Sequence, residues 1–117
     1  MLEVSMTKLK KLYESFKEAS FEIRPFLDIK NKLSNVNEVT EWVRGKHYDK
    51  HGYCQTIAAL YDYVDNGKGK GIMSFGHVAY IDGNKVYDPI NFSRVPVEVE
   101  EWKKKFPINQ TGNLITM

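Results

Sequence analysis

The chain has 117 residues, 42% of them hydrophobic and 27% charged, which is typical of a single globular domain spanning residues 1–117. Its 17 basic and 15 acidic residues are mixed along the chain, so we expect no nucleic-acid partner. Its single cysteine excludes an intrachain disulfide, and no run of about 18 apolar residues could span a membrane. Residues 1–11 lack an apolar stretch of signal-peptide length, so a cytoplasmic protein is expected.

The first half of the chain is predicted to be helical. Three segments carry apolar residues at helical spacing, and we expect helices there: 5–19, 36–44 and 53–65. Ser34 or Asn35 can cap the second helix, which Gly45 can end. Arg24-Pro25 interrupts the chain between the first two helices, because a proline disfavours helix in the preceding residue. Asn66-Gly67 ends the third helix.

The second half is predicted to be mostly strand. The expected elements, in order, are a flexible connection over 67–71, a strand over 72–81, a strand over 84–88, a short helix over 97–106 and a terminal strand over 113–117. Asp82-Gly83 is a strong hairpin signal between the first two strands, and Pro89 ends the second. Helices followed by an antiparallel sheet indicate the α+β class.

Cys54 is the first candidate for chemistry, because it lies near the start of the third predicted helix. Backbone N–H groups there lack partners within the helix, and the helix dipole favours negative charge, so a thiolate is stabilised. Ile57, Ala58 and Tyr61 follow it at helical spacing. Cys54 is therefore expected at the end of the buried stripe, where the helix meets the structure that it packs on.

The predicted hairpin supplies two partners for this cysteine. A two-residue turn at Asp82-Gly83 places His77 directly opposite Asp88, with Cβ atoms about 4.5–5.5 Å apart on the same face as the small residue Ala79. If the cysteine-bearing helix packs on that face, the three side chains converge. A turn centred on Gly83-Asn84 would instead pair Ala79 with Asp88 and break this alignment.

These residue types match the needs of nucleophilic catalysis. A thiolate is the nucleophile, a neighbouring imidazole takes its proton and later returns one, and a carboxylate fixes the orientation of the imidazole. We therefore predict Cys54 as the nucleophile, His77 as base and acid, and Asp88 as the orienting group. Tyr53 and Gln55 flank the nucleophile and are predicted to shape the substrate pocket. Asn91 is an alternative partner for the histidine.

Two blocks of the sequence resemble the transglutaminase-like superfamily. Residues 52–60, Gly-Tyr-Cys-Gln-Thr-Ile-Ala-Ala-Leu, are similar to its cysteine-helix motif of Gly-x-Cys, an alanine four residues after the cysteine and a leucine two further on. Residues 76–89 are similar to its second half, in which a histidine opens a strand, a turn follows and an aromatic residue precedes Asp-Pro. Ala79 stands where the family usually has an aromatic residue, and Tyr48 where papain-like proteases often have a glutamine.

The resemblance implies a papain-like core, with N-terminal helices and a cysteine-bearing helix packed on a small antiparallel sheet. It also implies acyl transfer through a thioester, as in peptide or isopeptide hydrolysis, deamidation and transamidation. Arylamine acetyltransferases share the order of the triad. We therefore expect a small cysteine hydrolase or acyltransferase acting on an amide, isopeptide or ester carbonyl of a protein or peptide, with no cofactor.

Three points leave alternatives open. The oxyanion needs a second hydrogen-bond donor, and the sequence does not single one out among the candidates His47, Tyr48 and His51. The chain could therefore instead be a catalytically degenerate papain-like fold that acts as a protein-binding or inhibitory module. His47 and His51 have a spacing that suits a metal on a helix, but their segment is predicted to be a loop with no second cysteine. Asp62 and Asp65 lack the spacing of a calcium loop, so no metal site is predicted.

Overall fold

The computed structural model describes residues 23–115, in which helices precede an antiparallel sheet. The helices are α2 (Arg24–Ile29), α3 (Val36–Gly45), α4 (Cys54–Val64) and α5 (Val99–Lys105). The strands are β1 (Lys70–Ser74), β2 (His77–Asp82), β3 (Lys85–Tyr87), β4 (Val97–Glu98) and β5 (Gln110–Gly112). The predicted α+β class is confirmed, whereas the helix expected over 5–19 lies outside the described residues.

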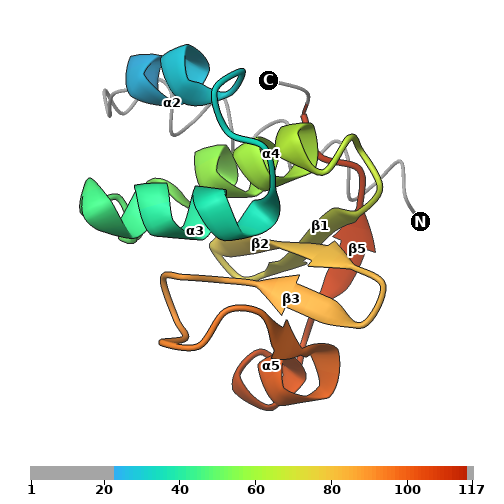
Figure 1. Ribbon diagram of the computed structural model, residues 1–117. Coiled ribbons are helices and arrows are strands. Elements are labelled where there is room, and N and C mark those ends of the chain that lie inside the picture. The colour runs from blue at the N-terminus through green and yellow to red at the C-terminus, as the bar shows by residue number, and fades with distance from the viewer. Residues whose placement is uncertain (1–22, 116–117) are drawn as a thin grey trace.

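The strands form one antiparallel sheet in the order β4-β3-β2-β1-β5, with helices on both of its faces. Figure 1 shows α2, α3 and α4 on one side of the sheet and α5 on the other. On the α4 side, Val78 and Tyr80 of β2 join the main apolar core. On the α5 side, Ala79 and Val86 pack in a second cluster with Trp102.

The two long helices agree with the prediction, because the signals that define them are local. Asn35 caps α3, and its side chain accepts a hydrogen bond from the Glu38 N–H at 3.0 Å. After α4, Asn66 and Gly67 turn the chain with φ of 60° and 70°. The short helix α2 was not predicted. Its proline, Pro25, stands in the first turn, where its missing N–H costs no intrahelical bond.

The predictions for the first strand and for the last one were wrong. A turn at Phe75-Gly76 divides the expected strand over 72–81 into β1 and β2, because Gly76 adopts a φ of +65° that glycine tolerates. The expected flexible connection over 67–71 is shorter, since β1 already begins at Lys70. The final strand is β5, which pairs with β1, and it ends before the expected range 113–117 begins.

The predicted register of the β2–β3 hairpin was also wrong. Ile81 pairs with Val86, so the two turn residues are Gly83-Asn84 instead of Asp82-Gly83. Gly83 has a φ of +61°, and Asn84 has no positive φ, which is the pattern of a type II′ turn. A type I′ turn at Asp82-Gly83 would require a positive φ at Asp82, which a residue with a side chain adopts less readily.

This register shift preserves the side of the sheet on which the candidate residues lie. The residue opposite each position of β2 moves by two positions along the following strand. Because side chains point alternately to the two faces of a sheet, a shift of two leaves every side chain on its original face. His77 and Asp88 therefore stay on one face as diagonal neighbours, about 7–8 Å apart at that spacing and within reach of long side chains. That face is covered by α5 and not by α4, so the condition under which the sequence analysis brought Cys54 to it is not met.

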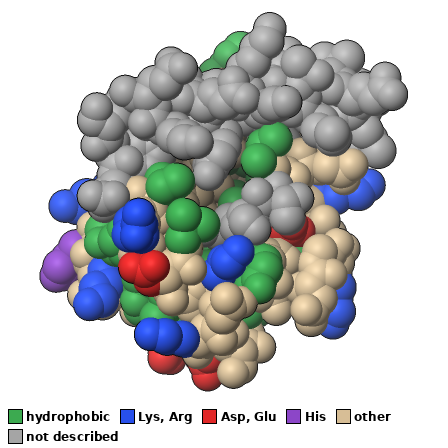
Figure 2. Space-filling view, turned by 90° about the horizontal axis from the view of Figure 1, so that it is seen from above, with side chains coloured by type: hydrophobic (Ala, Val, Ile, Leu, Met, Phe, Trp, Pro, Cys, Tyr) green, Lys and Arg blue, Asp and Glu red, His purple; other side chains and the backbone are tan. Residues whose placement is uncertain are grey.

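Two further features concern the helices and the charge on the described surface. No helix within residues 23–115 is long and apolar enough to cross a membrane. On the described part of the face seen from the helix side, basic side chains are separated by acidic, apolar and uncharged groups (Figure 2).

The connection into β1 is closely packed at Gly69. Its N–H donates to the Tyr80 hydroxyl at 2.9 Å, and that hydroxyl donates to Asp65 Oδ2 at 2.5 Å. A Cβ built on Gly69 would collide with the Ile81 carbonyl oxygen and with the Tyr80 ring. Gly69 is therefore needed for close approach to β2, and the connection is held by specific contacts.

We expect Gly69→Ala to lower the free energy of unfolding by about 1–3 kcal/mol, because the added methyl group forces apart closely packed atoms. Urea unfolding measures this change. Gly45→Ala is the matched control, since nothing lies within 4 Å of a Cβ there, and it should leave stability unchanged or slightly higher. Equal stability of the two variants would contradict the packing described for Gly69.

Candidate active site

The candidate nucleophile lies at the beginning of α4, as the sequence predicts. Gly52, with a φ of +102°, directs the chain into the helix, and the first bond into α4 runs from the Ile57 N–H to the Tyr53 carbonyl at 2.8 Å. The N–H of Cys54 precedes this bond and is among the helix-terminal donors that have no intrahelical acceptor. The Cys54 side chain itself is almost buried, with 2% of its residue surface exposed.

His77 and Asp88 form a buried pair at the start of β2. The distance from His77 Nε2 to Asp88 Oδ2 is 2.8 Å, and the two residues are only 3% and 2% exposed. The structure therefore brings these residues together as predicted, although through the diagonal register. Asn91, the alternative partner, joins them by placing Nδ2 3.0 Å from Nε2. When His77 is protonated both atoms are donors, so the carboxylate is the acceptor in this cluster.

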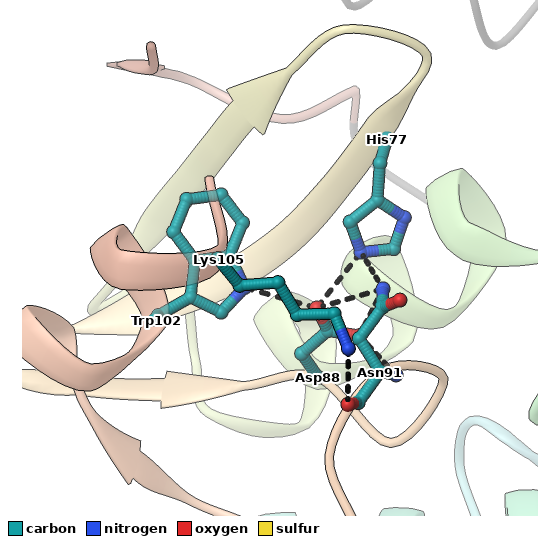
Figure 3. Close-up of polar contacts among 5 residues, drawn as sticks. All are labelled: His77, Asp88, Asn91, Trp102 and Lys105. Atoms are coloured by element: carbon teal, nitrogen blue, oxygen red, sulfur yellow. Dashed lines mark hydrogen bonds and ion pairs between the residues drawn. The ribbon is translucent and has the colours of Figure 1, made fainter. Parts of the chain in front are cut away.

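Asp88 receives donors from several parts of the chain (Figure 3). Oδ2 accepts from Trp102 Nε1 at 2.9 Å and from Asn91 Nδ2 at 3.2 Å, besides the bond to His77. Oδ1 accepts from the Asn91 backbone N–H at 3.3 Å. A buried charge without donors is expensive, so this set of bonds is what allows an ionised carboxylate at this depth.

The electrostatic balance favours an ion pair. Burial alone would lower the pKa of His77, but the hydrogen bonds and charges of Asp88 and Cys54 outweigh it and raise the pKa to about 9. Burial alone would raise the pKa of Asp88, but the bond to His77 and its charge, with the Trp102 and Asn91 donors, lower it. At neutral pH the pair is therefore imidazolium and carboxylate.

The second ring nitrogen of His77, Nδ1, is not bound by the Asp88 cluster. Figure 3 shows it pointing away from the Asp88 cluster, and among the described residues Nδ1 has no hydrogen-bond partner of normal geometry. Cys54 nevertheless acts on this imidazole, since its side chain is among the groups that raise the pKa of His77. A buried donor without an acceptor costs about 1–3 kcal/mol, so an acceptor on this side of the ring would stabilise the imidazolium.

Helix α5 and the segment after it complete the surroundings of His77. Phe106 stacks on the imidazole with ring centroids 5.3 Å apart, and Trp102 stacks on Phe106 at 4.4 Å. The sequence does not reveal these residues, because no local pattern links Trp102 to an aspartate 14 positions earlier. Lys105 adds a bond from Nζ to the Asn91 carbonyl at 3.4 Å.

Of the other residues predicted for the site, some lie near His77 and some pack in the apolar core. His51 lies edge-on to the His77 ring with centroids 5.9 Å apart, whereas Tyr48 packs against Phe26 at 5.0 Å. Tyr53 also contacts the Phe26 ring, at 5.7 Å. Gln55 is 2% exposed. The assignment of Tyr53 and Gln55 to substrate binding stays a prediction.

No described residues assemble into a metal site. His47 has a φ of 61° and lies beyond the end of α3, so it does not share a helical face with His51. Within residues 23–115, no group of three or more His, Cys, Asp or Glu side chains is arranged to hold an ion.

Comparison with protein-family models, with curated proteins and with solved structures finds no match to this chain.

We expect Asp88→Asn to lower the pKa of His77 from about 9 to its ordinary value of about 6.5 or below, because the charge that offsets burial is lost. A pH titration of the His77 ring by ¹H–¹⁵N NMR measures this. Asp28→Asn on α2, where the side chain is exposed, should leave the titration unchanged. A His77 that titrates alike in wild type and Asp88→Asn would contradict the ion pair.

We expect Trp102→Phe to lower the free energy of unfolding at pH 6 by about 1.5–3 kcal/mol, the range for a bond to a charged group. The lowered pKa of Asp88 stabilises the fold above about pH 4, and this contribution is lost as pH falls through the folded-state value. The difference from wild type should therefore shrink below pH 4. Urea unfolding at several pH values measures it.

Trp42→Phe is the matched control for this experiment. Trp42 packs on Phe26 at 5.1 Å, and it lies on α3, on the opposite side of the sheet from α5 (Figure 1). Its effect on stability should be the same at every pH. If the effect of Trp102→Phe is equally independent of pH, the indole does not act through the carboxylate.

Proposed function

We propose that this protein is a small cysteine hydrolase or acyltransferase with a papain-like, transglutaminase-like core. The observation that carries the proposal is that the two ring nitrogens of His77 have different surroundings. One nitrogen is bound to a buried carboxylate, and the other is unpartnered on the side on which Cys54 acts. Such a triad serves acyl transfer, in which the cysteine, histidine and acidic residue have the roles of nucleophile, base and orienting group.

The first half of the proposed reaction forms a thioester. The Cys54 thiolate adds to the carbonyl carbon of an amide, isopeptide or ester, and the carbonyl oxygen becomes an oxyanion. The N–H of Cys54 donates to this oxyanion, and we assign the second donor to His51, the one of the three candidates that contacts His77. The bond to the leaving amine or alcohol then breaks as His77 Nδ1 gives it a proton.

The second half releases the acyl group. A water molecule or an amine gives a proton to His77 Nδ1 and attacks the thioester carbon. The carbon–sulfur bond breaks, the thiolate of Cys54 returns, and the product is an acid or a new amide. No step requires a cofactor. Asp88 keeps Nδ1 directed at the sulfur by holding Nε2 throughout.

One observation favours the second candidate function, a protein-binding module of the same fold without turnover. Cys54 is 2% exposed, so an acyl group reaches the sulfur only if the covering side chains move. A free cysteine at such depth is often inert. The reactivity of the folded thiol therefore distinguishes the two candidates.

The test is the pH dependence of Cys54 alkylation by iodoacetamide, which is unambiguous because the protein has one thiol. For an enzyme, we expect alkylation to remain fast at pH 6, where an ordinary thiol is almost wholly protonated. His77→Ala should slow alkylation at pH 6 by on the order of 100-fold, since the imidazolium that favours the thiolate is absent.

His47→Asn is the matched control, because His47 is an exposed histidine with a positive φ that asparagine also adopts. It should leave the alkylation profile unchanged. A folded thiol that reacts only at high pH, equally in wild type and His77→Ala, would exclude the enzyme and leave the binding module.

A further inference from the structure

Two large apolar side chains stand out from the described surface. Phe75 is 84% exposed and Ile108 is 67% exposed, whereas the next large apolar residues, Tyr63 and Leu27, reach only 37% and 36%. Folding normally buries such side chains, and exposed apolar groups that gather in one place mark binding surfaces. We call Phe75 and Ile108 the apolar rim.

The two members of the rim are brought together by the fold. Phe75 lies in the turn between β1 and β2, and Ile108 lies in the segment between α5 and β5. The hydroxyl of Ser74, next to Phe75, donates to the backbone carbonyl of Ile108 at 2.8 Å. The backbone segments that carry the two rim residues therefore lie next to each other.

Both members of the apolar rim are close in the chain to residues at the imidazole of the candidate triad. Phe75 is two residues before His77, and Ile108 is two residues after Phe106, whose ring stacks on His77 at 5.3 Å. An acyl group bound to Cys54 must lie beside His77. The part of the substrate next to its carbonyl is thereby brought to the rim.

The chain around the rim indicates what kind of group fits. Among the described residues, the segments 71–76 and 106–115 contain no charged side chain, in a protein that is 27% charged overall. These two segments offer no charged side chain to pair with an acidic or basic group, and desolvating a charge against them would be unfavourable. An apolar group loses no hydrogen bonds there and gains contact with both side chains.

We propose that the apolar rim binds an apolar side chain of the acyl donor, next to the carbonyl that Cys54 attacks. The proposal rests on the proposed function and adds its substrate class: amides or esters with a hydrophobic group beside the reacting carbon. Phe75 and Ile108 are specificity-determining residues that act on binding, and the triad performs the chemistry.

The test is a series of N-alkylmaleimides, from methyl through ethyl and butyl to hexyl, reacting with Cys54 in the full-length protein. Each rate constant is divided by that for glutathione, which removes the intrinsic reactivity of the reagent. We expect the normalised rate constant to rise about two- to fourfold per methylene, the upper value corresponding to ~0.8 kcal/mol per buried methylene. Phe75→Ser and Ile108→Ser should each reduce this dependence by at least half.

Leu27→Ser is the matched control, because it removes an exposed apolar side chain from α2 and should leave the chain-length dependence intact. All three residues are exposed, so the variants are expected to fold. The rim proposal alone is overturned if Cys54 reacts but its normalised rate constant does not depend on alkyl chain length. It is also overturned if both rim variants retain the dependence of the wild type. A thiol that reacts with no maleimide in the folded state overturns the proposed function and the rim together.

A second copy of this chain is the other group that could cover the rim. Sedimentation of the wild-type protein tests this, because it shows whether the protein dimerises. Three results together would show that the rim is a dimer contact and that the proposal is wrong. These are a wild-type dimer, a monomeric Phe75→Ser variant, and maleimide rate constants that do not change with chain length. A monomer with a rising series supports the substrate role.

Discussion

The buried carboxylate of Asp88 is the constraint on which the rest of the described structure depends. An interior charge is stable only where protein donors replace the lost water, and here Oδ2 alone accepts from His77 and Trp102. These residues belong to β2 and α5, which are far apart in the chain. The atom that orients the imidazole is thus the one that fastens α5 to the sheet, so the site and the fold are stabilised by the same bonds.

The elements that the sequence predicted well are those with local signals. The apolar spacing of α3 and α4 and the cap at Asn35 are set within a few residues. The hairpin was harder because Gly83 lies between Asp82 and Asn84, so two neighbouring dipeptides both suit a two-residue turn. Which dipeptide forms the turn is decided by the pairing of the strands, and the sequence alone does not contain that information.

The candidate site was predicted through a register that proved to be wrong. His77 and Asp88 still meet because a shift of two residues leaves both side chains on one face. The contributions of Trp102 and Phe106 could not have been predicted. They depend on how α5 packs beneath the sheet, and that packing links positions with no local relation in the chain.

The contact between α4 and β2 has a consequence for how the site would work. Cys54 lies beside His77 at one end of this contact, and Asp65 is bonded to Tyr80 towards the other, so the helix is held at both ends and resists sliding along the strand. The alignment of thiol and imidazole is thereby set by regular elements, whereas loops form the apolar rim. Loop motion can change how readily a molecule reaches the sulfur while the acid–base pair stays aligned. If the proposed function holds, substrate choice and chemical rate are governed by different parts of the chain, and substitutions can alter one without the other.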